Sequence, residues 1–317
     1  MEKSIMRVRC FLVCLCIALL FTGLDAHGQG CSDAGFCTMG ALKPDQGYSK
    51  KLSIKLRSVE LSQYIGVTRF GDIIYNYTSD ISIGINNKST IQFKIPYVFV
   101  DGVLEKTNGV GDLSIGFAQN LVANDKFQVN LTLGTKIPVG SDNISVDGNE
   151  LPMYYQTGLG TFDGIIGISV ITKKWLFATG YQHAFNRTDN NFWWSDWEGH
   201  PDEAEALGYT QSKDLERGKD IMFRVERNFR FSNFNINIGL LPIYRLTEDS
   251  NISRGNVENK IPGSDGLALT LLLGGGYQFS VKSGIKIMNG FRVDRRPTNP
   301  DGLSREFVSN IGYVYKF

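Results

Sequence analysis

The chain has 317 residues and a formal net charge of +1, so its overall charge gives no reason to expect a nucleic-acid partner. Its length suits one large domain or two of ordinary size. The 35 glycines, 13 tyrosines and 20 phenylalanines, set against 9 prolines, favour an all-β fold. A hydrophobic content of 42% resembles that of a soluble protein, but strict alternation of apolar and polar residues produces the same average.

The N-terminus has the pattern of a secretory signal peptide. A basic start precedes the apolar run Cys10–Phe21, and small residues follow it. The run is too short to be a membrane-spanning helix. We expect residues 1–28 to be a signal peptide that exports the chain, with cleavage after Gly28 or, as the alternative, after Ala26.

Residues 29–50 show no alternation and precede the first predicted strand. We expect them to start in the periplasm, either as a plug that enters the fold or as a simple tail. Cys31 and Cys37 are the two cysteines of the mature chain, and in an oxidising compartment they are expected to form a disulfide. Lipidation of Cys31 is the alternative. Two such ligands do not suffice for a metal site, so no metal is predicted.

Alternating residues recur through the rest of the chain. In segment 126–139, apolar side chains occupy every second position and polar side chains or glycine lie between them. The apolar positions are Phe127, Val129, Leu131, Leu133 and Ile137. A period of two indicates a β-strand. The runs reach about ten residues or more, above the usual five or six, and match the 9–11 residues of a tilted membrane-spanning strand.

We predict about twelve strands within residues 51–317. Their spans are 51–66, 73–86, 89–100, 110–122, 126–139, 153–171, 174–186, 219–231, 233–247, 265–280, 284–296 and 304–317. An even number of strands places both chain ends on the same side of a membrane, as in bacterial outer-membrane barrels. The predicted fold is a transmembrane antiparallel up-and-down β-barrel, because no sheet edge can stay unpaired in hydrocarbon.

The predicted connections alternate between short and long. The short ones are 86–89, 123–125, 173–174, 232–233 and 281–284, and the long ones are 101–109, 141–152, 187–218, 247–265 and 297–304. Outer-membrane barrels have short periplasmic turns and long extracellular loops. A soluble sandwich has no reason to separate its connections in this way.

The chain ends on an alternating strand with Tyr313, Tyr315 and Phe317 on its apolar face. A terminal phenylalanine after such a strand resembles the signal that the bacterial barrel-assembly machinery reads. The lipid bilayer and this machinery are therefore expected partners, and the expected location is the bacterial outer membrane. The alternative is a chance phenylalanine at the end of a soluble edge strand.

Four stretches resemble the outer-membrane channel family named for the meta-pathway of phenol degradation. They are "NGVGDLSIGF", "GTKIPVGS", "GLGTFDGIIG" and "NPDGLSREF". The resemblance implies a barrel that passes small, often hydrophobic compounds. The family has no catalytic residues to carry over, and no cofactor is expected. The long connection 187–218 and the cysteine-containing N-terminus differ from the family's common pattern.

The polar face of the predicted strands carries ionisable side chains that are expected to line the lumen. They are Lys94, Asp112, Lys136, Asp163, Arg224, Glu226, Arg245, Lys286, Arg292 and Asp294. One interpretation is a charged lumen that selects a solute, with anions slightly favoured because bases outnumber acids. The other is a network of ion pairs that fills a narrow interior.

Two further features invite a functional interpretation. Connection 187–218 contains an aromatic cluster that either contacts a ligand outside the cell or anchors the loop at the membrane interface: Phe192, Trp193, Trp194 and Trp197. Gly274–Gly276 lie within a predicted strand, where they allow a bend of the wall or make room for an inward loop.

The sequence predicts a channel that admits or binds a small hydrophobic or anionic solute by passive diffusion, and no enzyme. The alternative is a surface receptor or structural barrel with a closed lumen. A less favoured hypothesis is an outer-membrane lipase-like hydrolase using His183, but the chain contains no G-x-S-x-G motif.

Overall fold

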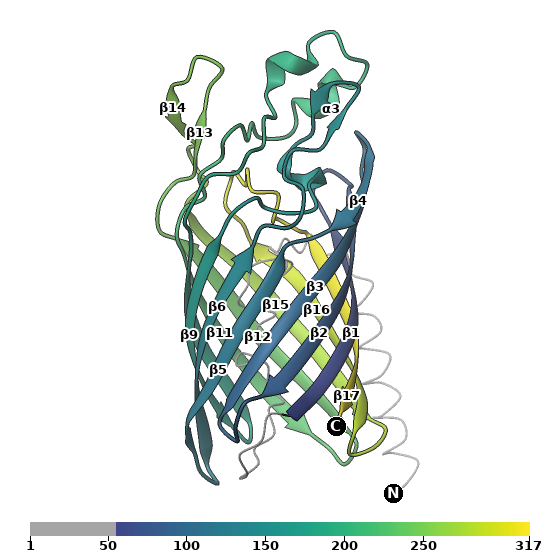
Figure 1. Ribbon diagram of the computed structural model, residues 1–317, viewed down its shortest axis with the longest axis vertical. Coiled ribbons are helices and arrows are strands. Elements are labelled where there is room, and N and C mark those ends of the chain that lie inside the picture. The colour runs from purple at the N-terminus through teal and green to yellow at the C-terminus, as the bar shows by residue number, and fades with distance from the viewer. Residues whose placement is uncertain (1–54) are drawn as a thin grey trace, which may run out of the picture.

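A computed structural model describes residues 55–317 of the chain. The predicted signal peptide, the segment 29–50 and the proposed Cys31–Cys37 pair lie outside the described residues. The described chain forms a tall barrel of tilted strands with a group of loops at one end (Figure 1).

One antiparallel sheet builds the barrel, and each strand pairs with its neighbours along the chain. Its strands are β1 (Lys55–Val67), β2 (Ile73–Gly84), β3 (Ser89–Asp101), β4 (Lys106–Val110), β5 (Leu113–Ala123), β6 (Phe127–Ile137), β9 (Asp163–Thr172), β10 (Trp175–Ala184), β11 (Asp220–Arg230), β12 (Phe234–Arg245), β15 (Gly266–Gln278), β16 (Ser283–Asp294) and β17 (Phe307–Lys316). β4 and β5 both pair with β3 and are consecutive parts of one wall strand, so the wall has twelve strands.

The barrel closes because the last strand pairs with the first. β1 and β17 run antiparallel from Ser58 opposite Lys316 to Val67 opposite Phe307. The wall therefore presents no unpaired strand edge, which is the condition for a sheet in hydrocarbon. The predicted closed, all-β, twelve-stranded antiparallel barrel is confirmed.

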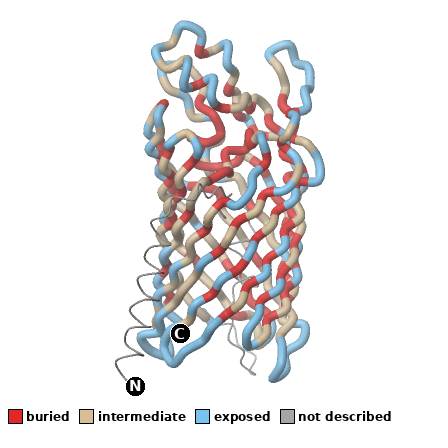
Figure 2. The backbone as a smooth tube through the Cα atoms, turned by 180° about the vertical axis from the view of Figure 1, so that it is seen from behind, coloured by how far each residue is buried: buried red, intermediate tan, exposed pale blue. Residues whose placement is uncertain are grey.

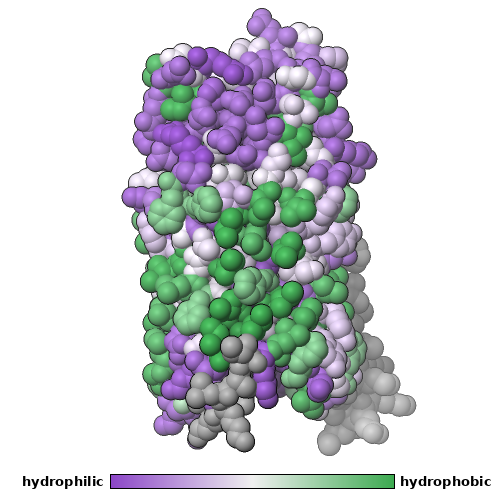
Figure 3. Space-filling model, viewed as in Figure 1, coloured by the Kyte–Doolittle hydropathy of each residue, from purple (hydrophilic) through white to green (hydrophobic). Residues whose placement is uncertain are grey.

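The side chains of the wall alternate between an apolar outside and a more polar inside. On β12, Ile236, Ile238 and Leu240 are exposed, whereas the intervening Asn237 and Gly239 are buried. The outward apolar residues of neighbouring strands form a belt over the wall, below a hydrophilic group of loops (Figure 3). Such a belt around a closed barrel is the surface that a bilayer requires.

The two ends of the barrel differ in their connections. At one end, which we call the short-turn end, the connections are 85–88, 124–126, 173–174, 231–233 and 279–282. At the other end, the connections 138–162, 185–219, 246–265 and 295–306 form what we call the loop cap. The C-terminus lies at the short-turn end (Figure 1).

The loop cap contains small elements of its own. They are β7 (Ser145–Val146), β8 (Asn149–Glu150), η2 (Met153–Tyr155), η3 (Trp194–Trp197), α3 (Glu203–Ala206), β13 (Ser250–Ile252) and β14 (Glu258–Lys260). No helix in the described part of the chain is long and apolar enough to cross a membrane.

The predicted strand 153–171 is wrong over its first part, because β9 begins only at Asp163. Residues 151–159 are all buried, whereas a wall strand buries every second residue. This stretch forms the 3₁₀ turn η2 and continues through Gly160, whose φ of +67° suits glycine. It belongs to the loop cap. The sequence indicated this, because residues 151–159 lack the alternation of apolar and polar residues that marks a wall strand.

The glycines in the middle of β15 make room for side chains of β12. A Cβ atom on Gly274 would lie 2.1 Å from Asn237 Oδ1, and one on Gly276 would lie 2.6 Å from Asn235 Oδ1. Asn235 and Asn237 pair with Gly276 and Gly274 across the two strands. The space therefore serves the amide side chains of the neighbouring strand rather than an inward loop.

Candidate functional site: the barrel interior beneath the loop cap

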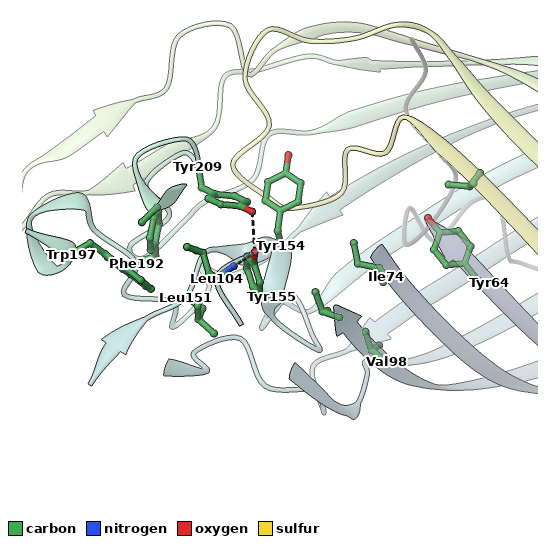
Figure 4. Close-up of a cluster of buried hydrophobic side chains, with 13 residues drawn as sticks. Tyr64, Ile74, Val98, Leu104, Leu151, Tyr154, Tyr155, Phe192, Trp197 and Tyr209 are labelled. Carbon is green, nitrogen blue, oxygen red and sulfur yellow. Dashed lines mark hydrogen bonds between the residues drawn. The ribbon is translucent and has the colours of Figure 1, made fainter. Parts of the chain in front are cut away.

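Buried residues concentrate where the loop cap meets the barrel (Figure 2). The hydrophobic centre of this region, which we call the cap core, brings together side chains from three connections: Leu104, Leu151, Tyr154, Tyr155, Phe192, Trp197, Ala206 and Tyr209. It continues onto the inward side chains Ile74, Val98 and Tyr64 of the wall (Figure 4). The loop cap is thus a packed layer seated on the barrel mouth.

A buried hydrogen-bond group ties the cap core to the wall. Asp72, at the start of β2, accepts hydrogen bonds from Tyr155 Oη at 2.7 Å and from Tyr209 Oη at 2.9 Å. The two hydroxyl oxygens are 2.9 Å apart (Figure 4). Burial raises the pKa of both tyrosines, and the Asp72 carboxylate raises it further, so both stay neutral donors. One carboxylate therefore holds two loops of the cap.

Arg245, at the end of β12, is the centre of a second buried group. Its guanidinium contacts Asp220 at 2.9 Å, Asp249 at 2.8 Å and Asp301 at 2.8 Å. Arg296 lies 3.5 Å from Asp220 in the same group. The wall and two loops of the cap meet at this one arginine.

The two loop carboxylates of this group have opposite pKa shifts. Burial alone raises the pKa of Asp301, but Arg245, Arg296 and Arg217 together hold it well below its usual value. Burial raises the pKa of Asp249, and the Asp301 charge adds to this despite the opposing effect of Arg245. Of these two carboxyl groups, Asp301 is therefore the one that stays ionised more readily.

Two more ion pairs lie near the mouth. Arg217, in the connection 185–219, pairs with Asp163 at 2.5 Å, and both side chains are buried. Lys136 Nζ lies 3.8 Å from Asp112, whose other partners are the backbone amides of Gly140 and Leu159. Each pair joins the wall to the loop cap or to a neighbouring strand.

Deeper in the barrel the polar groups are also paired. Arg224 contacts Glu226 on the same strand, and Asn237 donates to Glu226 at 3.0 Å. Nearer the cap, Arg292 contacts Glu306 of the connection 295–306. Lys286 lines a wider cavity of about 230 Å³ at the short-turn end, together with Arg230 and Lys316. The interior between the two ends also has an apolar side: Ile165, Ala178, Met222, Leu241, Ile243 and Leu272.

A smaller cavity of about 60 Å³ lies directly beneath the loop cap. Polar and charged side chains line one part of it, including Lys94, Lys136 and Arg305. Apolar side chains from the wall and η2 line the other, including Val98 and Tyr154. This space is small and amphipathic.

Most predicted lumen residues lie where the alternation places them. Asp112, Lys136, Asp163, Arg224, Glu226, Arg245 and Arg292 are buried, and Lys94 and Lys286 are half-buried and line the two cavities. Asp294 differs from the prediction. A register shift at the end of β16 pairs it with Leu269 rather than with an inward residue, and it is exposed.

The aromatic cluster of connection 185–219 does not face outward as a whole. Phe192 and Trp197 are fully buried in the cap core, so the expectation that they contact a ligand is wrong for these two residues. Trp194 is exposed, and its indole N–H donates to the Tyr209 carbonyl at 2.8 Å. Burying Phe192 and Trp197 stabilises the loop cap through the hydrophobic effect.

His183 and the aromatic residues at the end of the chain lie on the outer wall. His183 contacts the ring of Phe185 edge-on at 5.0 Å, and no described residue hydrogen-bonds to its Nδ1. Tyr313, Tyr315 and Phe317 are exposed on the outward side of β17, and the last two rings lie 5.0 Å apart. Their reading by assembly machinery remains a prediction.

Sequence reasoning missed the loop residues that hold the cap: Asp72, Tyr155, Tyr209, Arg217, Asp249, Asp301 and Arg305. Periodicity cannot find them because they lie between strands. One signal was available, since Asp301 and Arg305 lie in the "NPDGLSREF" stretch singled out above.

The closed wall, the apolar belt and the polar interior define the chain as a transmembrane β-barrel. In sequence, the chain matches no protein-family model and no curated protein. Its fold is similar to the crystal structure of an outer membrane channel from Pseudomonas putida F1, with a TM-score of 0.58 and 13% identity over 87% of this chain and 100% of that chain. The NanC porin is a more distant match, with a TM-score of 0.46 and 12% identity over 83% of this chain and all of that chain.

Proposed function

We propose that this chain is a channel of the bacterial outer membrane that admits or binds a small hydrophobic or anionic solute by passive diffusion. The observation that carries the proposal is the barrel's amphipathic interior, which has a cavity at each end and paired charges between them. The similarity in fold to the Pseudomonas putida F1 outer membrane channel supports it. The long loops of the cap then face outside the cell, and the short turns face the periplasm.

In this proposal the loop cap limits what passes. Asp72, Tyr155 and Tyr209 hold the cap on the mouth, and the space beneath it is about 60 Å³. A narrow, amphipathic passage favours small solutes and excludes bulky ones. Most charged groups along the path are engaged in ion pairs, which suits weak binding of a solute and passage without energy coupling.

The packed cap also favours a second candidate, a surface receptor or structural barrel with a closed lumen. Trp197, Phe192 and Tyr155 are fully buried, as in the core of a soluble domain. In this candidate the outer loops bind a partner and nothing crosses the barrel.

Conductance in planar bilayers separates the two candidates. We expect wild-type barrels to give small, discrete current steps, and Tyr209→Phe to give larger or more frequent ones, because it removes a hydroxyl that holds the cap on Asp72. Tyr244→Phe, on the exposed outer wall, is the matched control and should behave as the wild type. Absence of current from folded wild-type and Tyr209→Phe barrels would overturn the channel and leave the closed barrel.

A further inference from the structure

The connection 295–306 contains a buried arginine that has no acidic partner in the described part of the chain. Arg305 is 4% exposed, and its Nη1 donates to the carbonyl oxygens of Gly302 and Ser304. Its Nε has no hydrogen-bond partner, and among residues 55–317 no carboxylate forms an ion pair with it. The nearest aromatic face is that of Tyr154, 5.9 Å from the guanidinium carbon.

Other buried arginines of the interior contrast with Arg305. Arg217 pairs with Asp163, Arg224 with Glu226, and Arg245 with three aspartates. A buried charge is costly unless it is paired, so interior cations normally have a partner. The missing partner of Arg305 among residues 55–317 therefore points to a group that this part of the chain does not provide.

Arg305 lines the cavity of about 60 Å³ beneath the loop cap. The other charged groups of this cavity are already engaged: Lys136 with Asp112, Asp301 with Arg245, and Lys94 with a partner of its own. Leu303, Val98 and Met153 supply apolar surface in the same cavity. The cavity thus combines one unmatched positive charge with an apolar wall.

We propose that Arg305 binds the carboxylate of a small amphipathic monoanion, and that this is the solute of the channel proposed above, on which the inference rests. A guanidinium binds a carboxylate through two parallel hydrogen bonds, and the Nε of Arg305 has no hydrogen-bond partner among residues 55–317. The small volume of the cavity, about 60 Å³, limits the ligand to a carboxylate with a short aliphatic end. A single unmatched charge suits a monoanion better than a phosphate monoester.

Propionate and its neutral analogue propionamide test the site. Ligand-observed NMR titrations of the whole protein in detergent micelles are expected to show binding of propionate and at least tenfold weaker binding of propionamide. Arg305→Gln should weaken propionate binding at least tenfold. Arg305→Lys keeps the charge but loses the planar guanidinium, so its affinity for propionate should lie between those of the wild type and Arg305→Gln.

Arg295→Gln is the matched control, since Arg295 lies in the same connection with its side chain 38% exposed and 3.6 Å from Glu306. It should bind propionate as the wild type does. Heat-modifiable mobility on a detergent gel shows whether each variant folds. If Arg305→Gln does not fold, Arg305→Lys and the propionate–propionamide comparison in the wild type decide the matter.

Equal affinity of wild-type protein for propionate and propionamide would overturn the proposal, and so would unchanged propionate binding in a folded Arg305→Gln. Preference for inorganic phosphate over propionate would overturn the carboxylate assignment. These titrations do not need transport. A barrel that binds propionate through Arg305 and conducts nothing would refute the channel alone, whereas a conducting barrel indifferent to Arg305 would refute this inference alone.

Discussion

The barrel wall and the loop cap follow opposite rules for apolar side chains. On the wall, residues such as Leu240 and Ile238 face outward and are exposed, and the inward positions are largely polar. In the cap, Leu151, Tyr155 and Trp197 face one another and are fully buried. The difference reflects the surroundings, because lipid outside the wall accepts apolar groups and water above the cap does not. The same chain therefore exposes apolar side chains where it meets lipid and buries them where it meets water.

The largest effect is expected where the two regions join. Arg245→Met would leave Asp220, Asp249 and Asp301 without their shared cation, and breaking a buried ion pair costs about 3–5 kcal/mol. Urea unfolding in detergent, followed by tryptophan fluorescence, should show this loss. Faster proteolysis within connection 246–265 should accompany it.

Arg254→Met is the control for this prediction. Arg254 pairs with Asp196, but its side chain is 43% exposed, and exposed pairs contribute only about 0–1 kcal/mol. Equal destabilisation by the two substitutions would show that the Arg245 group does not join cap and wall.

A smaller effect is expected on the wall. Leu240 lies near the middle of β12 and is 46% exposed on the outer surface. Leu240→Arg should destabilise the barrel in lipid by about 2–4 kcal/mol, because it places a charge near the bilayer midplane. Unfolding in lipid vesicles measures this change. Leu246→Arg, just beyond the end of the same strand, should cost at most about 1 kcal/mol. A greater loss of stability in Leu246→Arg than in Leu240→Arg would contradict an apolar belt at the height of the middle of β12.

The smallest effect concerns alkaline pH and is confined to the cap. Burial raises the pKa of Tyr154 from about 10 to about 12, with smaller opposing effects of Arg305 and Arg69. Between these values the unfolded chain loses the proton and the folded cap keeps it, so stability falls as pH rises. The loss is about 1.4 kcal/mol per pH unit, and below pH 10 this group contributes no pH dependence.

Proteolysis of the cap at pH 8, 10 and 11 tests this effect, with Tyr154→Phe as the comparison. The variant lacks the titrating hydroxyl and its hydrogen bond to the Asn299 carbonyl, so it should be weaker at pH 8 but less sensitive to the rise in pH. An identical pH profile in both proteins would show that Tyr154 does not cause the loss of cap stability at high pH. Tyr155 and Tyr209, whose pKa values are also raised, would then be the next residues to substitute.

The wall was predictable because its rule is local. The ends of β2, β3, β10 and β11 agree closely with the predicted segments, and the buried polar side chains of the wall follow from a period of two. The sequence predictions failed where the two-residue alternation of the wall strands ends. Asp294 follows a register shift at the end of β16, and Met153–Tyr155 belong to a turn packed inside the mouth.

The cap was not predictable because its contacts join residues far apart in the chain. Asp72 and Tyr209 are separated by 137 positions, and their hydrogen bond leaves no periodic mark on either segment. Phe192 and Trp197 read as an exposed aromatic cluster in the sequence and are buried in the structure. Arg305 is conspicuous only once its surroundings are known.

By itself the sequence determined that this chain closes twelve alternating strands into a barrel, because each strand carries the two-residue period that lipid and a polar interior impose. Only the tertiary structure decided which charged side chains form ion pairs and that Arg305 has no acidic partner among residues 55–317. Ion pairing depends on distances of a few ångströms between side chains from separate loops, and such distances exist only after the cap has packed onto the barrel.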